Sequence, residues 1–299
     1  TAYLKLVRLP NVFTALADIL AAFVIVSATR LDDSVTLSGY LPLFGASAAL
    51  YLSGMAFNDI ADRREDAEYR PNRPIPSGQV SVSGAVVCAI LLMAIGNGLA
   101  ALVSKATLMH SVLLSAAILQ YDFSSKKNPL TGPVAFALCR FLNLRIGLSG
   151  HPDFEILQAA GTWMDWPWAP AIALGVYAAG LIVFSWQEET GKKERAITIG
   201  SVLCLAGIVM AGLSSSKLAW IALAPLAVLL QFLAFRLRKF GTPQAARDLV
   251  RAGVMGICLF DAGLILGHGG TNAWPFALAC VGLLAPGLLL GKLFSQKEA

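Results

Sequence analysis

A run of acidic residues in the sequence has the spacing of a metal and phosphate site on a helix. Asp59, Asp62 and Asp66 stand at i, i+3 and i+7, so on a helix their carboxylates lie along one face with steps of roughly 5 to 6 Å. Such a row of negative charges is unfavourable unless cations bind to it. Oxygen ligands suit Mg²⁺, which keeps several waters and binds through one or two carboxylates plus substrate phosphates. Asn58 adds a neutral oxygen one turn before Asp62, so we expect Asn58, Asp62 and Asp66 to bind the metal.

Basic residues beyond this run provide the positive charge that a phosphate site needs. Arg73 follows the acidic run closely, and Lys126 and Lys127 follow a later apolar segment. In this interpretation the carboxylates hold the cations, the cations bridge to a diphosphate, and the basic side chains offset the charge of the leaving group. Two alternatives stay open, since the acidic run would also suit a solvated loop and the two lysines would also suit a simple topological anchor.

The composition places these residues in a membrane protein. Of the 299 residues 57% are hydrophobic and only 14% are charged, with a mean hydropathy of +0.68, which is too apolar for a soluble domain. The first apolar segment is long enough to remain as a span, so we expect no cleavable signal peptide. We expect one integral membrane domain over residues 1–299, with ten spans at about residues 10–28, 38–58, 80–102, 106–121, 130–149, 167–186, 196–213, 217–235, 249–267 and 272–291.

The distribution of the 23 basic residues predicts the orientation of these spans. With the N-terminus inside, 18 of them fall in segments that face the cytoplasm, and three, Arg30, Lys105 and Lys217, fall in outer loops. This split favours both termini on the cytoplasmic side of the inner membrane. It places residues 59–79 and 187–195 as two cap loops on the cytoplasmic face. Topology and a phosphate site account for the net charge of +5, so we expect no nucleic acid partner.

Ionisable residues also occur inside the predicted spans. Arg140 and Asn143 lie at i and i+3 in the fifth span, and Asp18 and Asp261 lie within apolar segments. Because ionisable groups at membrane depth are costly, they usually face an interior cavity or a partner. An ion pair, for example between Asp18 and Arg140, and a contact with substrate are both open interpretations.

Two parts of the acidic and basic run together carry a family resemblance. Residues 58–66, followed by the Arg-Pro-Ile-Pro-Ser-Gly sequence of residues 73–78, resemble the first signature of the UbiA superfamily of intramembrane prenyltransferases. The opening Arg-Leu-Pro-Asn of residues 8–11 and the stretch 121–127 resemble that family more loosely. The similarity runs over about residues 4–270, which is most of the chain.

The resemblance implies an all-α polytopic membrane protein, a bundle of nine to ten transmembrane helices around a central cavity that opens sideways to lipid. Members of the family bind an isoprenyl diphosphate through two aspartate-rich motifs and Mg²⁺, ionise it to an allylic cation, and attach it to an aromatic or other lipophilic acceptor. The site residues that follow from the resemblance form three groups. The catalytic residues are Asp59, Asp62, Asp66 and Glu188, the diphosphate-binding residues are Asn58, Arg73, Lys126, Lys127, Lys192 and Arg140, and the polar cavity residues are Asn11, Asp18, Tyr121 and Asn143.

The second aspartate motif is the point where this sequence departs from the family. The family pattern has two aspartates four residues apart before Gly-Ile-x-Thr, whereas an ungapped match to residues 196–198 puts Glu188 and Lys192 at those positions. A carboxylate and an ammonium form a helical pair, but they do not hold a second Mg²⁺ as two carboxylates would. Either Lys192 binds phosphate directly or the second site is inactive.

Two functions therefore stay open. The first is a Mg²⁺-dependent prenyltransferase that joins an isoprenyl diphosphate to a hydrophobic acceptor within the lipid bilayer. The second is a non-catalytic UbiA-like membrane protein that binds or transports a lipid or small metabolite. Within the superfamily, residues 138–143 and 185–191 look most similar to the UbiA-like proteins called EboC, which are encoded in ebo gene clusters. The association of those clusters with export of small metabolites suits the second function.

Overall fold

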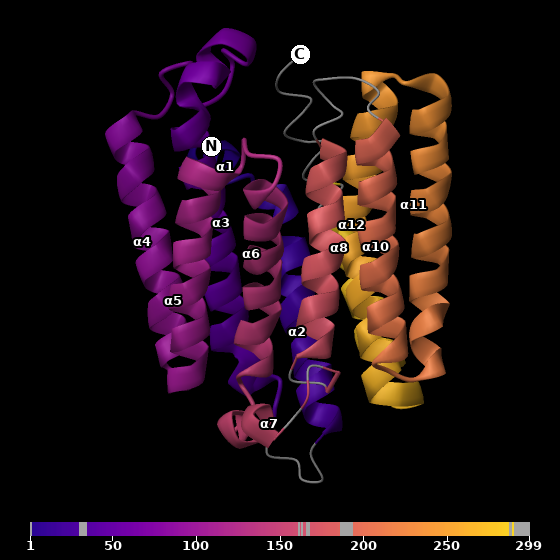
Figure 1. Ribbon diagram of the computed structural model, residues 1–299. Coiled ribbons are helices and arrows are strands. Elements are labelled where there is room, and N and C mark those ends of the chain that lie inside the picture. Colours follow the sequence, from indigo (N-terminus) through magenta and orange to yellow (C-terminus); the bar gives the residue numbers. More distant parts are fainter. Residues whose placement is uncertain are drawn as a thin grey trace.

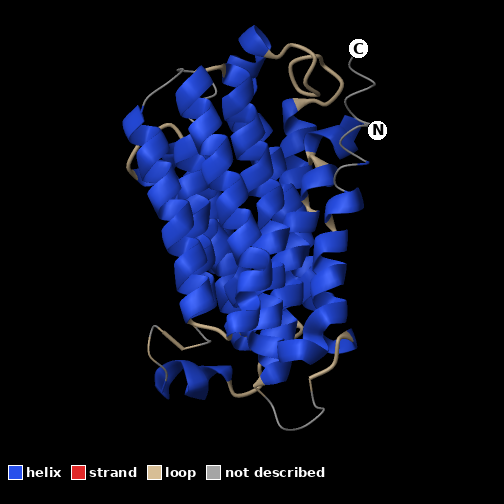
Figure 2. Cartoon of the chain, turned by 90° about the vertical axis from the view of Figure 1, so that its right-hand side faces the viewer, coloured by secondary structure: helices blue, strands red, loops and turns tan. Residues whose placement is uncertain are grey.

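The described part of the chain is a bundle of helices that run side by side (Figure 1) and are joined by loops (Figure 2). The computed structural model describes residues 2–29, 35–160, 162, 164–165, 168–185, 194–286 and 289. Its long helices are α2 (Phe13–Ala28), α3 (Leu41–Tyr69), α4 (Val82–Ala101), α5 (Lys105–Gln120), α6 (Thr131–Leu148), α8 (Ala169–Ser185), α10 (Glu194–Leu213), α11 (Trp220–Phe240) and α12 (Pro243–Gly269). Its shorter helices are α1 (Ala2–Leu6), α7 (Phe154–Ala160) and α13 (Trp274–Gly282).

Each of the first nine predicted spans overlaps one of the long helices. Six stretches of the described chain are long and apolar enough by themselves to cross a membrane. Three of the long helices, α5, α6 and α8, are not among these six stretches. Helix α8 is apolar but short, while α5 and α6 bury polar side chains inside the bundle, among them His110 and Arg145. The tenth predicted span contains α13, and its last residues lie outside the described part. The protein is therefore a multi-pass, all-helical membrane protein.

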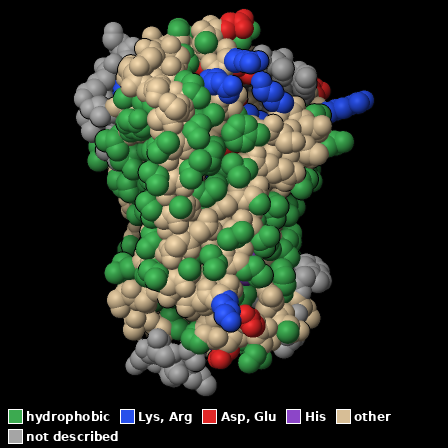
Figure 3. Space-filling view, turned by 90° about the vertical axis from the view of Figure 1, so that its left-hand side faces the viewer, with side chains coloured by type: hydrophobic (Ala, Val, Ile, Leu, Met, Phe, Trp, Pro, Cys, Tyr) green, Lys and Arg blue, Asp and Glu red, His purple; other side chains and the backbone are tan. Residues whose placement is uncertain are grey.

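The outer surface of the bundle is apolar where lipid would contact it. Large hydrophobic side chains are exposed along α4, including Val87, Leu91 and Ile95. Figure 3 shows such side chains around the middle of the molecule, with most of the visible lysines and arginines gathered at one end. This separation is typical of a protein whose waist lies in the hydrocarbon core and whose ends lie in water.

Helix α3 continues without a break through the acidic run. The sequence from Asp59 to Tyr69 contains no glycine or proline, and the first helix breaker is Pro71. Arg70 therefore leaves the helix with φ of −144°, as expected for a residue before proline, while its N–H still bonds Asp66 O at 2.8 Å. The predicted end of the second span at residue 58 and the predicted cap loop over 59–79 are corrected accordingly, since only residues 70–81 form the link to α4.

The chain between α5 and α6 folds as a π-helical turn, η3 (Tyr121–Ser125). Phe123 in this turn packs edge to face against Phe57 of α3, with ring centroids 6.0 Å apart. Asp122 and Ser125 are buried. The turn therefore holds the start of the following loop, with Lys126, against the acidic half of α3.

Helices α2 and α6 approach each other closely at Gly147. A Cβ at this position would lie 2.4 Å from the Cβ of Ala22, which is closer than real carbon atoms come. Only glycine allows this contact without moving a backbone. The close approach brings the polar side chains of α6 that lie two turns earlier against α2.

Candidate functional site

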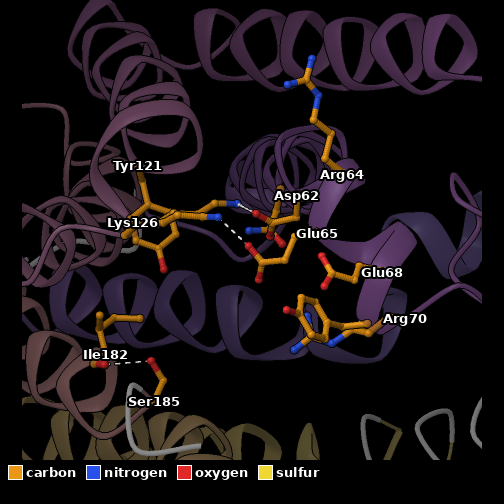
Figure 4. A pocket seen from close by; sticks show the side chains of 12 residues that line it. Asp62, Arg64, Glu65, Glu68, Arg70, Tyr121, Lys126, Ile182 and Ser185 are labelled. Carbon is orange, nitrogen blue, oxygen red and sulfur yellow. Dashed lines mark hydrogen bonds and ion pairs between the residues drawn. The ribbon is translucent and has the colours of Figure 1, made fainter. Parts of the chain in front are cut away.

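A cleft of about 1250 Å³ lies beside the acidic half of α3 (Figure 4). Asn58, Asp62 and Glu65 line it from α3, while Tyr121 and Lys126 line it from the π-helical turn and the loop after it. The three α3 residues stand at i, i+4 and i+7, so they share one face of the helix. The cleft therefore combines two carboxylates, an amide and an ammonium on opposing walls.

The predicted row of three aspartates divides between two faces of α3. Asp59 and Asp66 lie on one face, where the guanidinium of Arg73 contacts Asp59 at 3.3 Å and Asp66 at 2.6 Å. On an ideal helix Asp62 is turned about 60° from Asp59 and about 40° from Asp66, and it lies in the cleft, where its carboxylate is 2.5 Å from Lys126. The structure thus does not bring Asp66 together with Asp62, and it places Arg73 against the aspartates rather than in the cleft.

Asp66 is enclosed by basic side chains. Its own side chain is 1% exposed, and its second contact is with Arg70 at 3.5 Å, one turn later on the helix. Both carboxylate oxygens therefore face arginines instead of the cleft. In this arrangement Asp66 connects the end of α3 to the link that leads to α4, and the metal-binding role predicted for it stays a prediction.

Arg8 is a residue of the site that the sequence did not single out. It lies before the 3₁₀ turn η1 (Leu9–Asn11) and has left-handed backbone angles, with φ of 46°. Its guanidinium donates to Asp59 at 2.6 Å and to the side-chain amide oxygen of Asn58 at 3.3 Å. The available signal was the opening sequence of residues 8–11, which resembles the family without revealing where the arginine points.

Asp122 and Glu65 are two further carboxylates that the sequence prediction missed. Glu65 accepts a hydrogen bond from Lys127 at 2.5 Å, across the cleft from η3. Asp122 is 5% exposed and accepts from the Asn58 amide nitrogen at 3.2 Å. Burial raises the pKa of Asp122 to about 7, while the hydrogen bond from Asn58 and the charge of Lys126 oppose that rise. The helical spacing from Asn58 to Glu65 was a usable signal, whereas Asp122 lies in a turn that no sequence periodicity reveals.

An inner pocket of about 240 Å³ adjoins the cleft, because Asn58 and Tyr121 line both. Its other polar lining includes Arg8, Asn11, Tyr51, Asp122, Arg140 and Asn143. Of the predicted cavity residues, Asn11, Tyr121 and Asn143 therefore lie together around this pocket. Arg140 lines it as well, away from the cleft, and forms an ion pair with Asp18 at 3.3 Å. Glu188 and Lys192 lie outside the described residues.

The donor set of the cleft suits a magnesium ion that also binds phosphate. Within the described residues no group of three or more His, Cys, Asp or Glu side chains is placed to hold a metal by itself. Asn58 and Asp62 offer an amide oxygen and a carboxylate on adjacent turns, with Glu65 one turn beyond. Mg²⁺ commonly binds through one or two carboxylates and completes its shell with water and substrate phosphate oxygens. The residues therefore fit an ion shared with a diphosphate.

Comparison with known proteins gives consistent matches. The family model described as the UbiA prenyltransferase family matches residues 15–249. A digeranylgeranylglyceryl phosphate synthase of Methanopyrus kandleri is 35% identical over 133 residues, which is 44% of this chain and 47% of that protein. Two other curated digeranylgeranylglyceryl phosphate synthases match in a similar way. In all three cases the chain spans about half the length of the relative.

Solved structures resemble the fold over nearly the whole chain. A structure of a digeranylgeranylglyceryl phosphate synthase has a TM-score of 0.63 at 17% identity and covers 90% of this chain and 98% of its own. A UbiA homolog from Archaeoglobus fulgidus bound to GPP and Mg²⁺ has a TM-score of 0.52 at 14% identity and covers 97% of this chain and 99% of its own. At such low sequence identities the likeness shows the fold, which is the arrangement of the helices.

Proposed function

Because the chain belongs to the UbiA prenyltransferase family, we propose that it transfers an isoprenyl group from an isoprenyl diphosphate to a lipophilic or aromatic acceptor within the membrane. The observation that carries this proposal is the pairing of Asp62 with Lys126 across the cleft at 2.5 Å. Carboxylate and ammonium together suit a magnesium diphosphate, whose metal needs oxygen ligands and whose phosphates need positive charge.

Each side chain of the cleft has a distinct part in this proposal. Mg²⁺, when bound, neutralises the diphosphate and makes it a better leaving group. Asn58 and Asp62 hold the metal, and Lys126 binds a phosphate oxygen in place of its contact with Asp62. Glu65 and Lys127 close the outer wall of the cleft, where Lys127 is mostly in contact with solvent and Glu65 is partly exposed. A relative bound to GPP and Mg²⁺ supports prenyl diphosphates as the donor class.

The inner pocket provides the place where the acceptor meets the donor. Asn58 and Tyr121 stand at the boundary between cleft and pocket, so a diphosphate in the cleft directs its allylic carbon toward that boundary. The pocket is walled by helices and set back from the exposed cleft, and excluding water from an allylic cation prevents its hydrolysis. Arg8 and Asn11 on its wall offer hydrogen bonds for positioning a polar group of the acceptor.

Two finer assignments belong to the same proposal. The distribution of basic residues supports the proposal that both termini and the cleft lie on the cytoplasmic side of the inner membrane. Residues 138–143 and 185–191 support a place in the EboC-like subgroup of the family. In that subgroup a binding or transport role is the competing function, and it differs from the proposed one by the absence of turnover.

The test is release of inorganic diphosphate from GPP by the purified protein in detergent, in the presence of a panel of lipophilic and aromatic acceptors. We expect release that requires Mg²⁺, is abolished by a chelator, and falls at least about tenfold in Asp62→Asn because a charged contact of about 1.5 kcal/mol or more is lost. Asp248→Asn on α12 is the control, since Asp248 contacts Gln244 and lines neither pocket. Mg²⁺-dependent binding of GPP without release of diphosphate would instead support the binding or transport role.

A further inference from the structure

A buried polar cluster lies between α2, α6 and α12, outside the cleft. Asp18 on α2 has no exposed surface, and one carboxylate oxygen accepts hydrogen bonds from Asn143 at 2.7 Å and Arg140 at 3.3 Å. Arg140 also donates to the Thr14 hydroxyl at 2.8 Å. The donors to this oxygen of Asp18 are thus complete, and they come from α6.

A second carboxyl group faces Asp18 from α12. Asp261 has no exposed surface and lies within hydrogen-bonding reach of Asp18. Within the described structure, neither oxygen of Asp261 receives a hydrogen bond from an N–H or O–H donor, and the same holds for the remaining oxygen of Asp18. Two carboxyl groups in contact satisfy such oxygens only when a proton lies between them, because each ionised carboxylate can only accept.

The charges of the cluster lead to the same conclusion. Two ionised aspartates buried in a helix bundle would repel each other, and Arg140 is positioned to compensate one of them. The titratable and charged side chains that face Asp261 from the packed elements are Asp18 of α2, Arg140 of α6, Tyr177 of α8, Cys258 of α12 and Cys280 of α13. Among these described neighbours Arg140 provides the positive charge, so the second carboxyl needs a proton.

We propose that Asp18 and Asp261 form a proton-binding site in the membrane core, in which Asp261 carries one proton and donates it to the free oxygen of Asp18. With one proton bound, Asp18, Asp261 and Arg140 together have no net charge. The site joins α12 to α2 and, through Arg140 and Asn143, stands directly behind the inner pocket. Arg140 therefore presents a compensated charge to that pocket. This inference does not rest on the proposed prenyl transfer.

Infrared spectroscopy of the intact protein in detergent tests the site, since a protonated carboxyl has a carbonyl band that ionised carboxylates lack. The spectrum is recorded well above the pKa of Asp122, so that Asp122 is ionised. We expect the wild type to show a protonated carboxyl band, and Asp261→Asn, whose amide still donates to Asp18, to lose it. Asp248→Asn on the surface is expected to keep the band. A wild type without the band, or an Asp261→Asn variant that retains it, would overturn the proposal.

Replacement of the partner separates a shared proton from a carboxyl that burial alone keeps neutral. In Asp18→Asn, Asp261 becomes the single carboxylate beside Arg140, so we expect it to ionise and the band to disappear. Persistence of the band in Asp18→Asn would contradict a proton shared between Asp18 and Asp261. If Asp261→Asn does not fold, the double replacement of both aspartates by asparagine takes its place, and persistence of the band in that variant would overturn the proposal. Sodium chloride is compared with choline chloride, and loss of the wild-type band in sodium alone would assign the site to a metal cation.

Discussion

Three aspartates on the second half of α3 each have a basic partner, and the partner decides what the side chain does. Asp59 and Asp66 bind Arg73, and Asp66 is almost completely enclosed. Asp62 binds Lys126 at the wall of a cleft that is open to a ligand. A metal with its phosphates can replace Lys126 at Asp62, whereas at Asp66 it would have to displace two arginines that contact the carboxylate.

Asp62→Ala is therefore expected to weaken binding of GPP in the presence of Mg²⁺ while leaving the fold intact. A charge-assisted contact of about 1.5 to 3 kcal/mol corresponds to a loss of roughly ten- to a hundredfold in affinity. Titration of GPP by calorimetry, with and without Mg²⁺, measures the effect. Equal affinity in the variant and the wild type would mean that Asp62 does not hold the metal.

Asp66→Asn is the contrasting change on the same helix. It removes the charge that Arg70 and Arg73 share, and because those arginines are partly exposed, we expect a loss of about 1 to 3 kcal/mol in the free energy of unfolding. Thermal unfolding in detergent measures this loss. A fall in GPP affinity as large as that of Asp62→Ala, at unchanged stability, would return Asp66 to the metal site.

The two neighbouring lysines differ in exposure, so their replacement separates a binding role from a topological one. The Lys126 side chain is 12% exposed, whereas that of Lys127 is 72% exposed in its pair with Glu65. Lys127→Ala is expected to change stability by less than about 0.5 kcal/mol and to leave GPP affinity unaltered. Lys126→Ala is expected to lower that affinity. If both variants bind GPP like the wild type, the lysines only anchor the topology.

The helices themselves were largely predictable, and the turns between them were not. Apolar stretches and the first breaker at Pro71 are properties of the sequence, so the long helices of the described chain occur where hydropathy predicts spans. The acidic run was correctly expected on a helix, yet which aspartate faces the cleft depends on where Arg73 and Lys126 arrive from distant segments. Arg8 and Asp122 reach Asn58 through turns, and tertiary packing sets the geometry of such turns.

The contact of α2 with α6 at Gly147 can be tested through a matched pair of glycines. In Gly147→Ala the new methyl group meets the Cβ of Ala22 and forces the helices apart, which we expect to cost about 1 to 3 kcal/mol of stability. Gly98→Ala on α4 is the control, since nothing lies within 4 Å of its added Cβ. Thermal unfolding of both variants in detergent gives the comparison. Equal stability of the Gly147→Ala and Gly98→Ala variants would show that α2 and α6 can move apart without a loss of free energy of unfolding.

Most of the visible lysines and arginines gather at one end of the bundle (Figure 3), and the orientation of the molecule in the membrane can be measured. The cleft lies at the end where α3 leaves its apolar stretch, and the charge distribution predicts that this end is cytoplasmic. Engineered cysteines beside Arg64, Lys127 and Lys239 are expected to react only with a reagent that has entered the cell. Cysteines beside Lys105 and Lys217 are expected to react with an impermeant reagent from outside. An external Lys127 would contradict the predicted orientation.

The amide of Asn58 has a consequence for how two ligands sense each other. Its oxygen accepts from Arg8 and its nitrogen donates to Asp122, so this single side chain is held in one orientation by groups of opposite polarity. A ligand in the cleft that takes the oxygen breaks the contact of Arg8 with Asn58 and leaves Arg8, which also lines the inner pocket, held by Asp59 alone. We therefore expect occupancy of one compartment to change the affinity of the other, and thermodynamic linkage requires the factor to be identical in both directions. Under the proposed function, donor and acceptor are then heterotropic effectors of one another.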